Sequence, residues 1–212
     1  MKKIIKPTPE PTLRRMPRYL HLLNRLLESG TVVVSSTVIA NELHLDATQV
    51  RKDIEHTNIV GRPKTGYDVA NLIIAIEQFL NWNISNDAFL AGVGSLGTAM
   101  LGYGRFKKYG LNFLAAFDID KSKIGKKVHE VPVFAMEKLT EMAKELKINV
   151  GVLTVPAASA QTTAEMMVKG GIKGIWNFAP TQIKVQPNVI VENAQLSQSL
   201  AVLSHKLARS GK

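Results

Sequence analysis

The chain has 212 residues, of which 45% are hydrophobic and 21% charged, and it contains no cysteine. This composition is typical of a globular protein long enough for two hydrophobic cores, and it excludes disulfide bonds, thiolate metal sites and thiol nucleophiles. No apolar run reaches the roughly 18 residues that a membrane span needs, and prolines interrupt the basic N-terminus, so we expect a cytoplasmic protein without membrane or metal. The net charge of +10 favours a polyanionic partner such as nucleic acid.

The first 82 residues predict three short helices and, over residues 69–82, a buried helix that joins two domains. The first is expected to begin at Pro17, because Leu20, Leu23 and Leu27 recur at helical spacing, and to end at Gly30. Ser35 or Ser36 can cap a second helix over residues 37–43, with Val38, Ile39 and Leu43 turned inward. Asp46 can cap a third helix over residues 47–57, with Val50 and Ile54 facing the core. This arrangement indicates a helix-turn-helix.

The third helix should expose Gln49, Arg51 and Lys52. Glutamine suits adenine, arginine suits guanine and lysine neutralises phosphates, although such residues on a surface helix are more often only solvated. The context favours DNA, because residues 58–69 predict two brief β runs around a turn with Arg62 and Lys64 at its tip, as in a wing. The candidate DNA-binding residues are Ser35, Ser36, Gln49, Arg51, Lys52, Arg62 and Lys64.

A glycine-rich loop dominates the second half of the chain. Gly92-Val93-Gly94-Ser95-Leu96-Gly97 follows a predicted strand and opens a predicted helix, and the next strand ends in Asp118, 21 residues after Gly97. The glycines allow a pyrophosphate to approach the backbone amides closely, and the aspartate suits the hydroxyls of an adenosine ribose. Because a carboxylate repels a 2′-phosphate, this pattern favours NAD(H) over NADP(H), with another nucleotide or none as the alternative.

Strands and helices alternate after this loop, which predicts a Rossmann-type, doubly wound parallel sheet in an α/β protein. Thr154, Val155, Pro156 and Asn177 follow predicted strands and can line the nicotinamide side, although a proline can also simply end a strand. A terminal helix carries a stripe of Leu196, Leu200, Leu203 and Leu207, which can pack on its own domain or between chains. We therefore expect a winged-helix domain over residues 1–82, a Rossmann domain over 83–192 and a dimerisation helix over 193–212.

Eight segments together resemble the Rex family of redox-sensing transcriptional repressors. They are VSS at 34–36, QVRKDI at 49–54, GYDV at 66–69, GVGSLG at 92–97, AAFDID at 115–120, LTVPA at 153–157, SAQ at 159–161 and GIKGIWNFAP at 171–180. The resemblance implies a homodimer with an exchanged C-terminal helix, bound to palindromic operator double-stranded DNA and released when NADH binds. By position, Tyr103 matches a family tyrosine near the nicotinamide.

The chain departs from the family pattern in two places. Some members pair an arginine of the first helix with an aspartate before the exchanged helix, whereas the matching positions here are His21 and Gln195. The wing turn has the sequence RPKTG instead of the more usual arginine-glycine arrangement.

The candidate cofactor-binding residues are Gly92, Val93, Gly94, Ser95, Leu96, Gly97, Tyr103, Asp118, Thr154, Val155, Pro156 and Asn177.

Two other functions are compatible with the glycine loop. A small NAD-dependent dehydrogenase would share it, but we expect no enzyme, because the chain leaves no room for a substrate domain and its histidines are scattered. A nucleotide-gated interaction protein that binds coenzyme A or another dinucleotide is the third class, and Asp118 argues against it.

Overall fold

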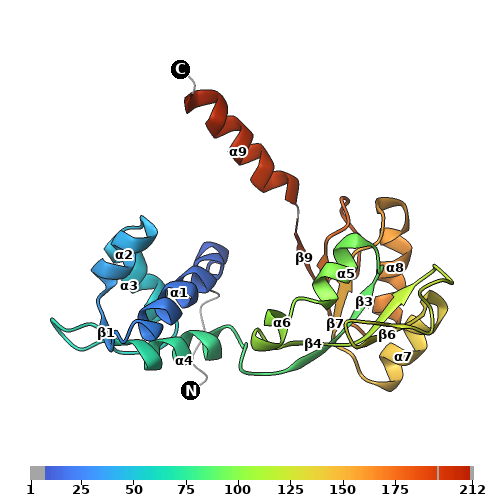
Figure 1. Cartoon of the computed structure of the whole chain (residues 1–212), viewed down its shortest axis with the longest axis horizontal. Helices are drawn as coiled ribbons and strands as arrows, with labels where there is room; N and C mark the ends of the chain where they lie inside the picture. Colours follow the sequence, from blue (N-terminus) through green and yellow to red (C-terminus); the bar gives the residue numbers. More distant parts are fainter. Residues whose placement is uncertain (1–7, 195, 211–212) are drawn as a thin grey trace. The chain divides into compact units, whose positions relative to one another are not determined.

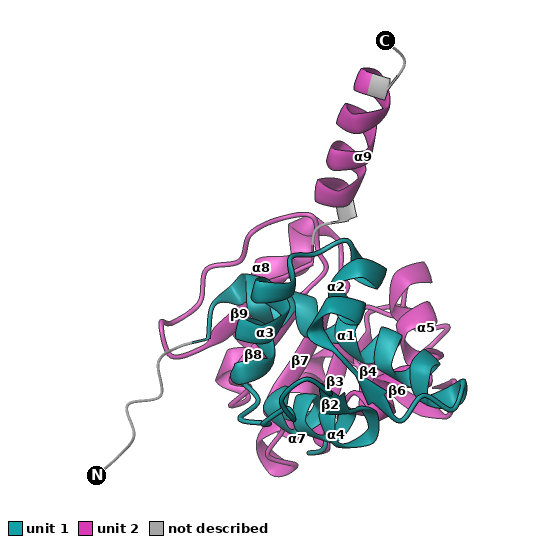
Figure 2. Cartoon of the chain, turned by 90° about the vertical axis from the view of Figure 1, so that its left-hand side faces the viewer, with its two compact units in different colours: residues 1–84 teal, residues 85–212 magenta. Residues whose placement is uncertain are grey.

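The computed structural model describes residues 8–194 and 196–210 of the chain. The chain divides into unit 1, Met1–Ile84, and unit 2, Ser85–Lys212 (Figure 2). Among the described residues, no helix has the length and apolar character that a membrane span requires.

In unit 1, the described residues form four helices, α1 to α4 (Figure 1), and a small two-stranded sheet. Its elements are α1 (Glu10–Glu28), β1 (Val33–Val34), α2 (Ser36–Leu43), α3 (Ala47–Glu55), β2 (Tyr67–Asp68) and α4 (Val69–Phe79). Their apolar faces share one core, in which Tyr19, Leu23, Ile39, Ile54 and Leu72 are completely buried. The predicted helix-turn-helix is confirmed, and Ser35 and Asp46 cap α2 and α3 as expected.

The first helix begins earlier than the sequence predicted. Helix α1 starts at Glu10 and contains Pro17 in its interior, although proline removes a backbone hydrogen bond there. The turns before Pro17 are held because Met16 is buried in the core and Thr12 hydrogen-bonds to Asp53 of α3. The prediction for Leu27 was also wrong, since this side chain is 45% exposed.

Two details of the following segment also differ. Val38 is 43% exposed rather than turned inward. Residues 58–60 form no strand; instead β2 pairs antiparallel with β1, and a tight turn between Arg62 and Gly66 forms the tip of the wing. Strand pairing depends on a partner far away in the sequence, which local patterns do not specify.

Unit 2 has a seven-stranded sheet in the order β5-β6-β4-β3-β7-β8-β9, parallel except for β5. Its strands are β3 (Asn86–Ala91), β4 (Leu111–Asp118), β5 (Lys127–Val128), β6 (Val131–Ala135), β7 (Val150–Leu153), β8 (Gly174–Asn177) and β9 (Ile190–Asn193). Its helices are α5 (Ser95–Leu101), α6 (Arg105–Lys108), α7 (Leu139–Glu145), which follows the 3-10 turn η1 (Met136–Lys138), α8 (Ala157–Lys169) and α9 (Leu196–Ser210). The Rossmann-type fold is confirmed, while β5 and β9 were not predicted.

Helices cover both faces of this sheet because its strands are apolar on both sides. Along β3, Phe89 packs in the core beneath α7 and α8, whereas Leu90 packs in the core beneath α5. Every described side chain from residue 197 to 209 of α9 is exposed, including Leu200, Leu203 and Leu207.

Candidate functional site

A cavity of about 500 Å³ lies in unit 2 at the carboxyl ends of the parallel strands. Its lining residues follow β3, β4, β6, β7 and β8: Gly92, Gly94, Leu96, Asp118, Ile119, Lys123, Met136, Thr154, Val155, Pro156, Ser159, Thr163, Phe178 and Pro180. The strand order reverses between β3 and β7, which is where doubly wound folds bind nucleotides. The volume is in the range of small-molecule pockets.

The glycine loop has the backbone that close approach of a phosphate requires. Gly92 has φ +98°, and a Cβ there would lie 2.8 Å from the carbonyl oxygen of Thr154. A Cβ on Gly97 would lie 2.0 Å from the carbonyl oxygen of Gly92, whereas one on Gly94 would meet nothing within 4 Å. Gly92 and Gly97 are therefore required for packing, while Gly94 leaves open space beside the backbone. These features fit a bound pyrophosphate.

Asp118 ends β4 beside this loop, and its carboxyl group is largely buried. Its Oδ2 accepts a hydrogen bond of 2.7 Å from the backbone N–H of Val93, and its Oδ1 accepts one of 2.8 Å from the backbone N–H of Asp120. The Lys123 ammonium lies 3.6 Å from Asp118 Oδ2. A carboxylate has about four acceptor positions, so it can still accept the hydroxyls of a ribose. Lys123 was missed by the sequence analysis, although the charged segment after Asp118 was a signal for it.

Four other predicted cofactor residues do not line this cavity: Val93, Ser95, Gly97 and Asn177. Val93 is buried, and Ser95 begins α5. Asn177 is 1% exposed, and its amide donates hydrogen bonds of 2.8 Å to the Thr181 carbonyl and to Asn193 Oδ1, so it holds the segment after β8.

Tyr103 lies in a different and smaller hollow. This hollow has a volume of about 130 Å³ and also contains His129 and Phe106, whose ring centroid lies 4.9 Å from that of Tyr103. Tyr103 is therefore not among the residues that line the cavity of about 500 Å³.

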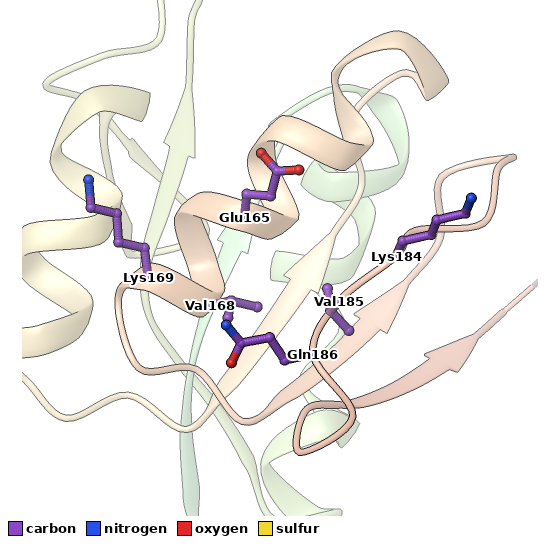
Figure 3. Close-up of a pocket in the computed structure, with 6 residues that line it drawn as sticks. All are labelled: Glu165, Val168, Lys169, Lys184, Val185 and Gln186. Atoms are coloured by element: carbon purple, nitrogen blue, oxygen red, sulfur yellow. The ribbon is translucent and has the colours of Figure 1, made fainter.

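A third hollow, of about 610 Å³, lies between α8 and the segment before β9 (Figure 3). Glu165, Lys169 and Lys184 are among its lining residues, and the two lysine side chains point away from one another (Figure 3). Because its charged groups do not converge, this hollow lacks the features of a phosphate site.

In unit 1, α3 exposes Arg51 and Lys52 as predicted, whereas Gln49 is only partly exposed. Asp46 caps the first turn of the helix by accepting hydrogen bonds from the backbone N–H groups of Thr48 and Gln49, and these bonds lower the pKa of its carboxyl group. Arg62 and Lys64 are exposed in the wing turn. Ser35 uses its hydroxyl to accept from the Val38 N–H, and Ser36 is partly exposed.

A buried carboxylate that was not predicted from the sequence, Asp53, joins α3 to α1. Asp53 is completely buried and accepts hydrogen bonds from four side chains: Thr12 at 2.9 Å, Arg15 at 2.8 Å, Tyr19 at 2.6 Å and Gln49 at 2.9 Å. Burial raises the pKa of Asp53, but the four hydrogen bonds outweigh it and the pKa is lowered. His21 of α1 is exposed, and Gln195 lies outside the described residues.

Two family models match the chain. The model described as "CoA binding domain" matches residues 83–181, and the one described as "Putative DNA-binding protein N-terminus" matches residues 8–54.

Curated relatives cover almost the whole chain. A protein of Treponema denticola named "Redox-sensing transcriptional repressor Rex" is 51% identical over 91% of this chain and 92% of its own length. The chain belongs to the Rex family. A protein with the same name from Bacteroides thetaiotaomicron is 43% identical over 94% of this chain and 90% of its own length. The resemblance seen in the sequence is confirmed, and this family is one of transcriptional repressors rather than enzymes.

Solved structures of a Rex-family repressor called RSP are also similar. The structure titled "Crystal structure of RSP in complex with beta-NAD+ and operator DNA" has a TM-score of 0.90 and 33% identity, and covers 97% of this chain and 95% of that one. The complex of RSP with beta-NADH has a TM-score of 0.88 and 34% identity, and covers 99% and 97%. The winged-helix and Rossmann architecture is thus that of a Rex repressor.

Proposed function

We propose that this chain represses transcription by binding operator DNA through unit 1, and that NADH held in unit 2 weakens this binding. The observation that carries the proposal is the cavity at the carboxyl ends of β3, β4 and β7, where an open glycine backbone at Gly94 lies in the same lining as the buried Asp118. In this arrangement the glycine loop receives the pyrophosphate and Asp118 the adenosine ribose. The nicotinamide supplies the two redox states that the protein senses.

The operator-binding surface consists of α3 and the wing. Arg51, Lys52, Arg62 and Lys64 are exposed there, and the cap residues Ser35 and Asp46 fix the starts of the two helices of the helix-turn-helix. We assign the arginines and lysines to phosphates and base edges, and Ser35 and Ser36 to the DNA backbone beside the start of α2.

A homodimer follows from α9 and from the symmetry of operators. Leu200, Leu203 and Leu207 are spaced at three and four residues along one side of this helix, and all are more than half exposed. Such an apolar stripe is stable when a second copy covers it, and winged-helix repressors read palindromes as two-fold dimers. We assign residues 193–212 to this contact and place the repressor in the cytoplasm, where it meets the chromosome.

The decisive experiment is a titration of operator binding with NADH and with NAD⁺. We expect NADH to weaken binding by about 5- to 150-fold relative to NAD⁺, since coupling free energies are commonly about 1–3 kcal/mol. Equal affinities in the two cofactors would refute redox sensing and leave a DNA-binding protein.

Coenzyme A is a second candidate ligand because of the description of the family model over residues 83–181. Its ribose carries a phosphate, which the Asp118 carboxylate would repel. We therefore expect coenzyme A not to displace NADH in a fluorescence competition, and displacement at comparable concentrations would favour the alternative.

A further inference from the structure

The contact between Gln49 and Asp53 determines which way the glutamine amide faces. Asp53 accepts hydrogen bonds from Thr12, Arg15 and Tyr19, so it is an ionised carboxylate and can only accept. The amide group 2.9 Å from its Oδ1 must therefore be the nitrogen of Gln49. Turning the amide over would place two acceptor oxygens against each other, which is unfavourable.

The amide oxygen of Gln49 is consequently accessible to solvent. Among the described residues, no buried side-chain nitrogen or oxygen lacks a hydrogen-bond partner. The Gln49 nitrogen donates to Asp53 and its backbone N–H donates to Asp46, while its Oε1 takes part in no hydrogen bond within the described chain. This oxygen is therefore an exposed acceptor on a side chain that is held in place at its other end.

Gln49 is also in the part of α3 that meets base edges in helix-turn-helix proteins. It is the third residue of the helix, and the N-terminal residues of a recognition helix contact the bases. It lies on the flank between the buried residues Val50 and Asp53 and the exposed Lys52. A side chain that reaches the groove from this flank needs a fixed direction, which the bond to Asp53 supplies.

We propose that Asp53 is a positioning residue for operator recognition: it holds the Gln49 amide with Oε1 outward, so that Gln49 accepts a hydrogen bond from the exocyclic amino group of an adenine or a cytosine. The inference rests on the operator-binding function proposed above. It adds a specificity determinant, because guanine and thymine present a carbonyl oxygen where the amino group would be.

The test uses the full-length protein and a duplex selected from random sequence. Each adenine is replaced singly by purine and each cytosine by 2-pyrimidinone, which removes only the exocyclic amino group. At one base of each half-site we expect this removal to weaken wild-type binding about fivefold, the equivalent of one hydrogen bond, and to leave Gln49→Met unchanged. If no base distinguishes the two proteins, the inference is wrong. If the wild type selects no duplex, the operator-binding function itself fails.

A second set of variants tests the role of Asp53. The double variant Arg15→Met/Asp53→Ala removes the carboxylate without leaving a buried cation, and we expect it to lose the preference for the amino group. Tyr19→Phe keeps the Gln49 contact and should retain the preference. If the double variant binds all duplexes more weakly by the same factor and keeps the preference for the amino group, Asp53 has only a structural role. If circular dichroism shows that this variant is unfolded, the comparison of wild type with Gln49→Met decides.

Discussion

Replacing Gly97 or Gly94 of the glycine loop by alanine should have different effects: the first should lower stability, and the second should lower the affinity for NADH. In Gly97→Ala the new Cβ would lie 2.0 Å from the carbonyl oxygen of Gly92 and 3.0 Å from Thr154 Oγ1. Ordinary carbon–oxygen contacts are about 3.3 Å or longer, so the start of α5 must move away from the loop. Overpacking of this kind costs about 3 kcal/mol, which outweighs the gain of about 1 kcal/mol in helix propensity.

The net cost of about 2 kcal/mol should lower the melting temperature of unit 2 by about 6–12 °C, at about 3–6 °C per kcal/mol for a unit of this size. Gly94→Ala is the matched control, because its Cβ would meet nothing within 4 Å and its φ of −78° suits alanine. This variant should melt like the wild type but bind NADH at least tenfold more weakly, since the methyl group occupies the space beside the backbone. The assays are thermal unfolding and NADH fluorescence. Wild-type stability in Gly97→Ala, or wild-type NADH affinity in Gly94→Ala, would refute the assigned roles.

Three further predictions concern other parts of the chain. Because the pKa of Asp53 is lowered in the folded protein, its stabilisation is present above the ordinary value of 3.8 and is lost as the pH falls through the lowered value. The helical signal of unit 1 should thus unfold in acid below about pH 4, and a midpoint between pH 5 and 7 would point to another group. Glu130 has φ +67° in the tight turn between β5 and β6, so Glu130→Gly should raise the free energy of unfolding by about 0.5–1 kcal/mol in urea titrations. A lower value would mean that the turn is not strained. Replacing Arg51 and Lys52 by alanine should reduce the slope of log affinity against log salt by about 1 for each phosphate that is no longer neutralised. Lys184→Ala, in unit 2, should leave the slope unchanged, and a change there would contradict the assigned surface (Figure 3).

Much of the fold could be predicted from local sequence patterns. The caps Ser35 and Asp46, the glycine loop and the strand that ends at Asp118 are all where the sequence predicts them. Capping depends on a side chain and the backbone within three residues of it, and a glycine turn depends on backbone freedom at single positions. Both are properties of short segments, so a sequence without a structure is sufficient to find them.

The contacts between distant segments were decided only by the tertiary structure. Thr12, Arg15 and Tyr19 of α1 donate to Asp53 of α3, and these bonds account for the early start of α1. The cavity likewise collects residues that follow five different strands of the sheet. A hydrogen bond between residues about forty positions apart leaves no periodic signal in a single sequence, because its formation depends on the packing of the helices that carry it. The sequence by itself therefore determined the two domain types and the nucleotide loop, while the structure determined how the DNA-reading helix is held.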